Sequence, residues 1–173
     1  MTDLASVYDE AAQTAPEWGE WGDLRRCFTQ IDRLFDDTLR AIPVAEDFTI
    51  GESVPPCPVV GRYTPEMLEW VEYGAFALFP TRKALEDNAE VADQLVCYLT
   101  EYLVRNAGGL TVNVPANGTP VYEGIGPSVC YDYTSDVDNP VDMLLSMIEH
   151  DAGFTDDIAD RIDDYRDSGA WPQ

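Results

Sequence analysis

The segment 84–107 constrains the fold of this chain most, because it has the pattern of one long amphipathic helix. Apolar side chains recur in it at three- and four-residue steps, which places them on one side of a helix. The members of this stripe are Val91, Leu95, Tyr98, Leu99, Tyr102 and Leu103. Gly108-Gly109 follows, and glycine readily ends a helix in the left-handed conformation. We therefore expect a helix that buries this stripe and ends at Gly108.

Other segments carry the same helical periodicity. Residues 23–42 predict a helix whose buried side holds Leu24, Phe28, Ile31, Leu34, Phe35 and Leu39, and which Pro43 ends. Thr64-Pro65 predicts a helix that begins with Thr64 as its N-cap and ends at Pro80.

The two ends of the chain are less regular. Asn139-Pro140 begins a helix near the C-terminus, and Thr155 is expected to cap a last helix on the surface, ended by Gly169. At the other end we expect a short helix over residues 3–14, after which the glycines at 19 and 22 break any helix.

Strand-like segments lie between the helical ones. The runs LTVNV (110–114) and PVYE (120–123) flank PANGT, and Asn117-Gly118 is a strong hairpin signal because both residues tolerate positive φ. SVCYDY (128–133) predicts a third strand. The sequence thus predicts one α+β domain over residues 1–173, with about five helices packed on a small antiparallel sheet of three or more strands.

The charge of the chain limits its partners. Its 33 acidic and 10 basic residues give a formal net charge of −23. Nucleic-acid backbones and anionic membranes both need clustered cations, so we expect neither direct nucleic-acid binding nor membrane binding. A basic protein is the natural partner. An alternative is that the acidity reflects adaptation of a whole proteome to salt, in which case it serves solubility.

The acidic residues are unevenly distributed along the chain. Residues 132–167 hold 12 acidic side chains against two basic ones, Arg161 and Arg166. Such a block is either a solvated face or a docking surface for a cationic partner. The sequence alone leaves both interpretations open.

Tyrosines accompany this block. Strand alternation places Tyr131 and Tyr133 on one face and Asp132 on the other, and Tyr122 stands on the expected hairpin. Tyrosine often anchors protein interfaces. The predicted partner-binding residues are therefore Tyr122, Tyr131, Asp132, Tyr133, Asp136, Asp138 and Asp142. The alternative is that the tyrosines lie on a sheet face that packs against helices.

Catalytic motifs are sparse. A nucleophile needs a base within hydrogen-bonding reach, and His150 is the only histidine. A small hydrolase that uses Ser128 or Cys130 with His150 remains an alternative, although no G-x-S-x-G elbow is present. The glycine-rich phosphate-binding and dinucleotide-binding patterns are also missing, so we expect no cofactor and a non-catalytic protein.

Metal-binding patterns are incomplete as well. The four cysteines are widely spaced, which argues against structural zinc and favours free thiols. Asp136 and Asp138 begin a calcium-loop spacing, but Pro140 stands at the next ligand position and the required glycine is missing. We therefore expect no metal site.

The run LVCYLTEYLVRNAGGLTVNVPANGTPVY, continued by SVCYDY, resembles a module of small acidic bacterial proteins, some of which are immunity proteins of secreted-toxin systems. This resemblance implies a protein that occludes the basic active-site surface of a cognate toxin in the producing cell. A second hypothesis is a nucleic-acid mimic that inhibits a DNA-binding enzyme. The N-terminal segment lacks the basic and apolar regions of a signal peptide, so we expect a cytoplasmic protein of undetermined oligomeric state.

Overall fold

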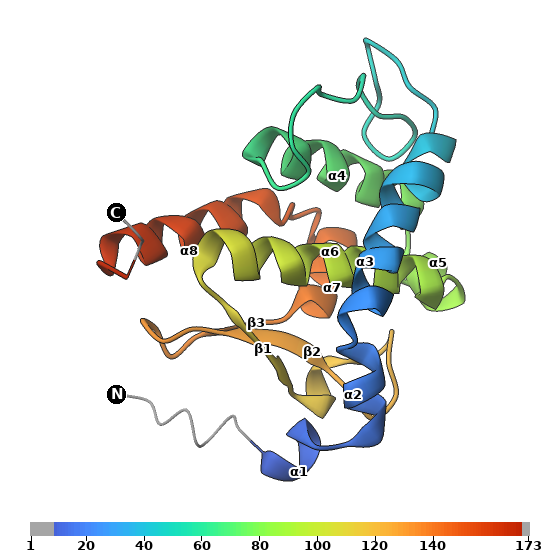
Figure 1. Ribbon diagram of the computed structural model, residues 1–173. Coiled ribbons are helices and arrows are strands. Elements are labelled where there is room, and N and C mark those ends of the chain that lie inside the picture. The colour runs from blue at the N-terminus through green and yellow to red at the C-terminus, as the bar shows by residue number, and fades with distance from the viewer. Residues whose placement is uncertain (1–8, 171–173) are drawn as a thin grey trace.

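Helix α6, Ala89–Ala107, lies at the centre of the computed structural model, which describes residues 9–170 (Figure 1). Every residue from Ala92 to Thr100 is buried. Gly108, at φ 65°, ends the helix in the left-handed conformation, as expected. The long helix expected over 84–107 is interrupted, however, because the Asn88 side chain donates to the Ala84 carbonyl at 2.8 Å and ends a separate helix, α5 (Arg82–Asp87).

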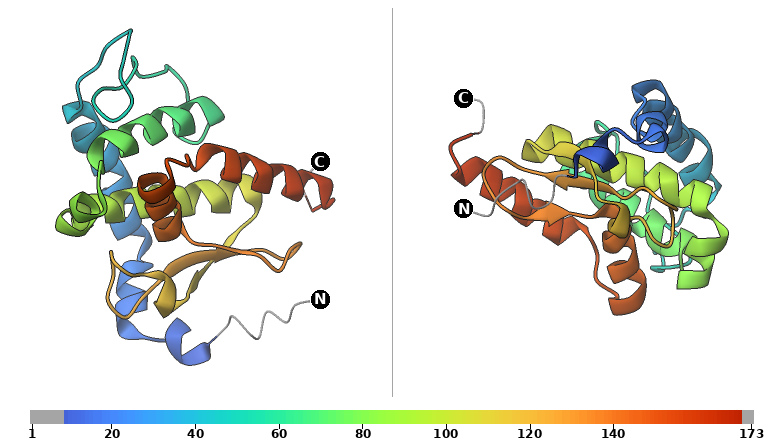
Figure 2. Two further views of the ribbon diagram at one scale, coloured as in Figure 1. Left: turned by 180° about the vertical axis from the view of Figure 1, so that it is seen from behind. Right: turned by 90° about the horizontal axis from the view of Figure 1, so that it is seen from below.

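Helices α3, α4, α7 and α8 surround α6, and the sheet lies on one side of it (Figure 2). This agrees with the expected α+β class: among the described residues, five helices have seven or more residues, and they pack with a three-stranded antiparallel sheet. The remaining helices are α1 (Glu10–Gln13), α2 (Pro16–Trp21), α3 (Leu24–Arg33), α4 (Pro65–Leu78), α7 (Pro140–His150) and α8 (Thr155–Asp167).

The sheet has the order β1-β2-β3, and its strands are β1 (Leu110–Asn113), β2 (Pro127–Cys130) and β3 (Val137–Asp138). β1 pairs antiparallel with β2, with Leu110 opposite Cys130. The predicted hairpin over 110–123 is therefore wrong in its second strand, because the partner of β1 comes later in the sequence. Residues 120–123 instead form a turn in which the amides of Val121 and Tyr122 donate to the Gly118 carbonyl.

Gly118 itself has a different role from the one expected. Its φ is −88°, so the site does not need positive φ. A Cβ at this position would lie 1.7 Å from the carbonyl oxygen of Ile125, because the backbone of the returning chain crosses directly over it. Glycine is therefore required here for close approach of two backbones.

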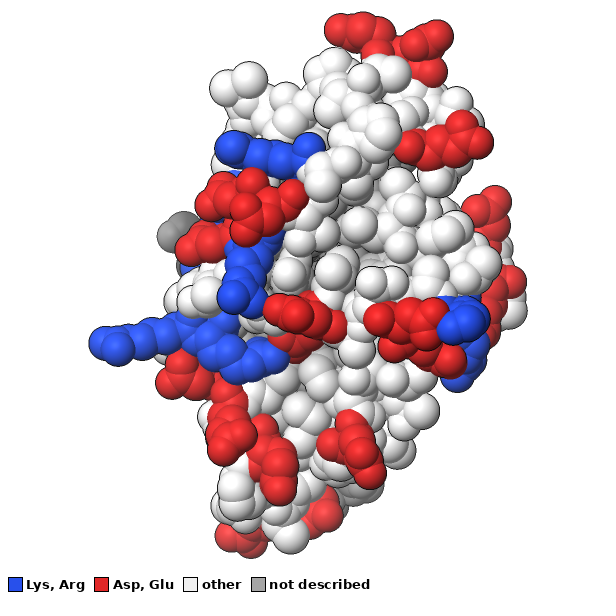
Figure 3. All heavy atoms as spheres, turned by 90° about the vertical axis from the view of Figure 1, so that its right-hand side faces the viewer, with Lys and Arg blue, Asp and Glu red and all other residues white. Residues whose placement is uncertain are grey.

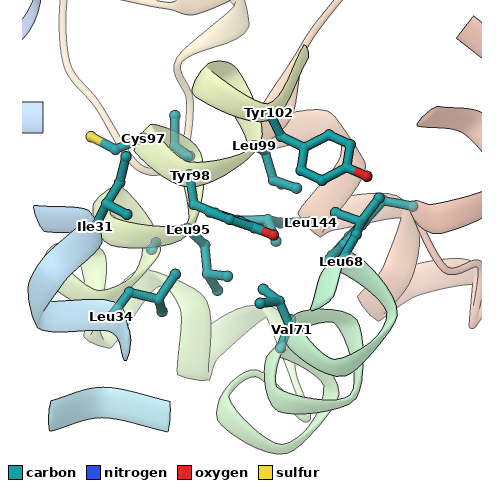
Figure 4. Close-up of a cluster of buried hydrophobic side chains, with 14 of the residues drawn as sticks. Ile31, Leu34, Leu68, Val71, Leu95, Cys97, Tyr98, Leu99, Tyr102 and Leu144 are labelled. Atoms are coloured by element: carbon teal, nitrogen blue, oxygen red, sulfur yellow. The ribbon is translucent and has the colours of Figure 1, made fainter. Parts of the chain in front are cut away.

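The core is built mainly around the α6 stripe (Figure 4). Leu95, Tyr98 and Leu99 project between side chains of α3, α4 and α7, which supply Ile31, Val71 and Leu144 among others. Beyond Arg33, where α3 ends, the chain continues in a π-helical turn, Leu34–Thr38, and then in a 3-10 turn, Leu39–Ala41. This winding keeps Leu34, Phe35 and Leu39 buried, as expected.

Some helix boundaries and faces differ from the expectations. Leu24 and Phe28 are 67% and 38% exposed, contrary to the expectation that they lie on the buried side of their helix. Helix α2 continues through Gly19, contrary to expectation. Thr155 is not an N-cap: its backbone amide donates to a Glu72 carboxylate oxygen at 2.7 Å, and that carboxylate stabilises the start of α8 from outside the helix.

Other expectations agree with the structure or lie outside it. The Thr64 hydroxyl accepts from the Met67 amide, so this cap is confirmed. The predicted helix start at Asn139-Pro140 is confirmed as well, and the Asn139 side chain accepts from the Val141 amide. Half of the expected helix over residues 3–14, residues 3–8, lies outside the described residues; within the other half, α1 is present. Among the helices described over residues 9–170, none combines the length and the apolar character needed to cross a membrane.

The central position of α6 gives a stability prediction. We expect Leu95→Ala to lower the free energy of unfolding by about 2–5 kcal/mol, because Leu95 is fully buried and its truncation leaves a cavity. Leu24→Ala is the matched control and should change it by less than about 0.5 kcal/mol. Urea denaturation followed by circular dichroism measures both; equal losses would contradict the central role of α6.

Candidate functional site: an acidic groove between α7 and α8

The sequence block with 12 acidic residues folds into two helices and a short strand that enclose an open groove. The groove has a volume of about 360 Å³. Among the described residues, six aspartates and one arginine line it: Asp136, Asp138, Asp142, Asp157, Asp160, Asp164 and Arg161. Three of these aspartates (Asp136, Asp138 and Asp142) are among the partner-binding residues predicted from the sequence, and all three line the groove.

Arg161 is held by three of the groove aspartates. Its Nε and Nη2 donate to the two carboxylate oxygens of Asp138 at 2.9 and 3.2 Å, which is a bidentate arrangement. Its Nη1 lies 3.2 Å from Asp136 and 3.4 Å from Asp164. The Arg161 side chain is only 12% exposed. Arg161, the only basic residue that lines the groove within residues 9–170, is therefore paired with Asp138, Asp136 and Asp164.

The other three aspartates have no such partner. Within residues 9–170, no ion pair joins Asp142, Asp157 or Asp160 to a cation, and all three are exposed. They face the groove from both helices, Asp142 from α7 and the other two from α8. The groove therefore presents uncompensated negative charge on two sides, an arrangement that attracts an external cation.

Buried groups beneath the groove keep its walls in place. The Tyr131 hydroxyl donates to Asp138 Oδ2 at 2.6 Å, and the guanidinium of Arg161 lies 5.0 Å from the centre of the Tyr131 ring. Burial raises the pKa of Tyr131, and the Asp138 carboxylate raises it further, so the phenol remains a donor. Burial lowers the pKa of Arg161, but Asp138 more than compensates, and the guanidinium stays charged.

The tyrosines do not form the exposed anchors that the sequence suggested. Tyr131 is 1% exposed, and Tyr133 is half-buried, with its hydroxyl donating to the Ala107 carbonyl at 2.8 Å. The two rings do lie together, 5.3 Å apart, beyond the end of β2. Tyr122 is away from both of them, in contact with α6 and Trp21. The packed-face alternative describes these tyrosines better.

The predicted partner-binding residues and the acidic residues of the groove overlap only in part. Asp132 is exposed but does not line the groove. Asp157, Asp160 and Asp164 were not singled out, although their three- and four-residue spacing places them on one side of a helix. That spacing was the available signal. Their position opposite Asp138 and Asp142 depends on how α8 packs, which no local pattern contains.

A second polar cluster lies inside the molecule, around Asp93 of α6. Asp93 is 5% exposed. Its carboxylate accepts from the Tyr122 hydroxyl, from Trp21 Nε1 at 2.9 Å and from Gln30 Nε2 at 2.5 Å, and it forms an ion pair with Arg26. Burial raises the pKa of Asp93, but these donors outweigh burial and hold the pKa below its usual value.

The residues of the hydrolase alternative are engaged separately. The Ser128 hydroxyl donates to the Gly126 carbonyl and accepts from Asn117 Nδ2, each at 3.0 Å. The Cys130 thiol donates to the Leu110 carbonyl at 3.5 Å. His150 is exposed at the end of α7, and within the described part of the chain no hydrogen bond joins it to either residue.

Residues 9–170 contain no group of three or more His, Cys, Asp or Glu side chains arranged to hold a metal ion. Comparison with protein-family models, with curated proteins and with solved structures finds no match to this chain.

The Asp93 cluster predicts a large effect of one substitution. We expect Asp93→Asn to lower the free energy of unfolding by about 3 kcal/mol, because it leaves Arg26 without its buried counter-charge. Asp160→Asn removes the same charge from an exposed position and should change it by no more than about 0.5 kcal/mol. Urea denaturation at neutral pH measures the difference.

The same cluster predicts part of the acid sensitivity. Because the pKa of Asp93 is lower in the folded than in the unfolded protein, its contribution is complete above the unfolded value of about 4 and is lost as pH falls through the folded value. Asp93→Asn should flatten this part of the stability profile below pH of about 4. An unchanged profile would show that Asp93 does not titrate with folding.

Proposed function

We propose that this chain is a non-catalytic, cytoplasmic binding protein whose acidic groove receives basic side chains of a protein partner. The observation that carries the proposal is the unequal charge pairing of the groove. Arg161 neutralises one set of carboxylates, whereas Asp142, Asp157 and Asp160 remain unpaired on facing helices. Unpaired like charges held close together repel one another, and a cationic partner would relieve that repulsion.

The chemistry of the groove favours arginine or lysine side chains as its occupants. The bidentate pair between Arg161 and Asp138 illustrates the geometry in which a carboxylate binds a guanidinium group. The volume of about 360 Å³ is open to solvent and matches a few protruding side chains more closely than a large organic ligand. Electrostatic attraction would also raise the association rate with a basic partner.

The basic side chains elsewhere on the protein do not conflict with an acidic docking groove. On the face that carries α3 and α5, basic side chains gather toward one edge and again at α5, with carboxylates between and beside them (Figure 3). Arg82 contacts Glu86 and Glu149, and Lys83 contacts Asp87. Neither of these paired cations lines the groove, whose only basic lining residue within residues 9–170 is Arg161.

Within this class, the resemblance stated above favours an immunity protein that blocks a toxin. The acidic groove would cover the basic surface with which such a toxin engages its own anionic substrate. The nucleic-acid mimic and the hydrolase remain predictions. For the hydrolase, the contacts of Ser128 and Cys130 lack the base that the chemistry requires.

Three neutralising substitutions test the groove. We expect Asp142→Asn, Asp157→Asn and Asp160→Asn together to weaken binding of a short arginine-rich peptide by about tenfold or more, because they remove its unpaired counter-charges. The control is Glu46→Gln, Asp47→Asn and Glu52→Gln, which removes equal charge from the exposed loop between α3 and α4. Calorimetric titration at two salt concentrations measures both variants.

The control separates a docking surface from general attraction. Equal weakening in both triple variants would mean that net charge alone binds the peptide, and the groove would be rejected as the site. Binding should weaken as salt rises, because exposed charges are screened. A salt-independent affinity would contradict an electrostatic docking surface.

The immunity hypothesis has its own test. We expect the full chain to co-purify in a stable complex with the product of a neighbouring gene and to restore growth of cells that express that product. The groove variant should lose both effects, and the loop variant should keep both. Protection by the groove variant at the wild-type level would reject the proposed mode of inhibition.

A further inference from the structure

Two cysteines meet on the side of α6 that faces α3. The Cys27 thiol of α3 donates to the Trp21 carbonyl at 3.2 Å. Arg26 Nη1 donates to the same carbonyl at 3.3 Å and lies 3.6 Å from Cys97 Sγ of α6. Both thiols are free. The two sulfur atoms therefore belong to one small cluster that joins α3 to α6.

A cavity gives access to this pair from solvent. It has a volume of about 450 Å³, and both cysteines line it. The exposed Leu24 and Phe28 line it too, which explains why the sequence-based assignment of these residues to the core was wrong. Cys27 is half-buried, whereas Cys97 is 2% exposed. A small solute in the cavity thus reaches Cys27 before Cys97.

The surroundings shift the pKa values of the two thiols in opposite directions. The neighbouring Cys97 thiol lowers the pKa of Cys27; burial opposes this, and the nearby Arg26 guanidinium supports it. The Cys27 thiol, together with burial, raises the pKa of Cys97. Cys27 is therefore the thiol that ionises first, and a thiolate is the nucleophilic form of cysteine.

We propose that Cys27 and Cys97 are a redox modification site that small hydroperoxides oxidise to a disulfide. The Cys27 thiolate attacks the terminal oxygen of the hydroperoxide, the O–O bond breaks, and the departing alkoxide takes a proton from solvent to become an alcohol. Cys27 is then a sulfenic acid. The Cys97 thiol attacks the Cys27 sulfur, the S–S bond forms, and the S–O bond breaks with release of water.

This site is independent of the acidic groove, because its residues lie on α3 and α6 and none of them lines the groove. A disulfide here would tie α3 to α6 covalently. It would form next to the Asp93 cluster, since Cys97 Sγ lies 3.9 Å from Asp93 Oδ1 and Arg26 contacts both groups. Oxidation is therefore expected to stabilise the folded state.

The test uses the full-length, reduced protein and hydrogen peroxide. We expect the intact mass to fall by two hydrogen atoms, and peptide mapping to find Cys27 joined to Cys97. The variant Cys97→Ser should stop at a Cys27 sulfenic acid that dimedone captures. Cys27→Ser should slow thiol loss by about tenfold or more, because the activated thiol is gone. The exposed Cys57→Ser is the matched control and should oxidise like the wild type.

A second measurement needs no variant and covers the case in which a substitution disturbs folding. In the native wild-type protein, Cys27 should be alkylated faster than Cys57 near neutral pH, even though Cys57 is more exposed. The reason is that partial desolvation raises the pKa of the Cys57 thiol, whereas the pKa of Cys27 is lowered. Slower alkylation of Cys27 than of Cys57 would overturn the proposal. So would a disulfide that includes Cys57, or peroxide treatment that leaves both Cys27 and Cys97 reduced.

Discussion

The burial of α6 on nearly all sides is the constraint on which the rest of the structure depends. A helix in this position carries polar side chains into the interior, and each needs a partner there. Asp93 is satisfied from α2, α3 and the loop that carries Tyr122, and Gln94 accepts from the Thr38 hydroxyl at 2.6 Å. Thr100 is the exception, since its buried hydroxyl has no partner within residues 9–170. These polar contacts fix how α2 and α3 pack on α6.

The same helix separates two regions with different chemistry. On one side, α6 supports β2 and α8, and the end of α6 provides the Ala107 carbonyl that binds Tyr133 beneath the groove. On the other side, it contributes Asp93 and Cys97 to the contact with α3. The anionic groove and the dithiol therefore have separate side chains but a common scaffold. A change that shifts α6 would alter both, whereas the substitutions of exposed groove aspartates alter one.

Periodicity and capping predicted much of this fold because they are local. The α6 stripe, the left-handed Gly108 and the caps at Thr64 and Asn139 each depend on a few neighbouring residues. The prediction of a second hairpin strand was wrong because of a contact between residues far apart in the sequence. The Tyr122 hydroxyl binds Asp93, so that segment turns toward α6 and leaves β1 to pair with residues 127–130. A two-residue strand such as β3 is too short to leave a pattern.

The groove illustrates what composition can and cannot specify. Counting charges in the sequence located the acidic block, but it does not show which of the carboxylates pair with Arg161. Asp138 is largely neutralised by a bidentate pair above the Tyr131 ring, and it serves mainly to hold β3 against α8. Asp157 and Asp160, which the sequence did not distinguish from their neighbours, are exposed and form no ion pair within residues 9–170. The residues most strongly bonded in the groove are thus its framework, and the unpaired ones are those that the proposed partner would contact.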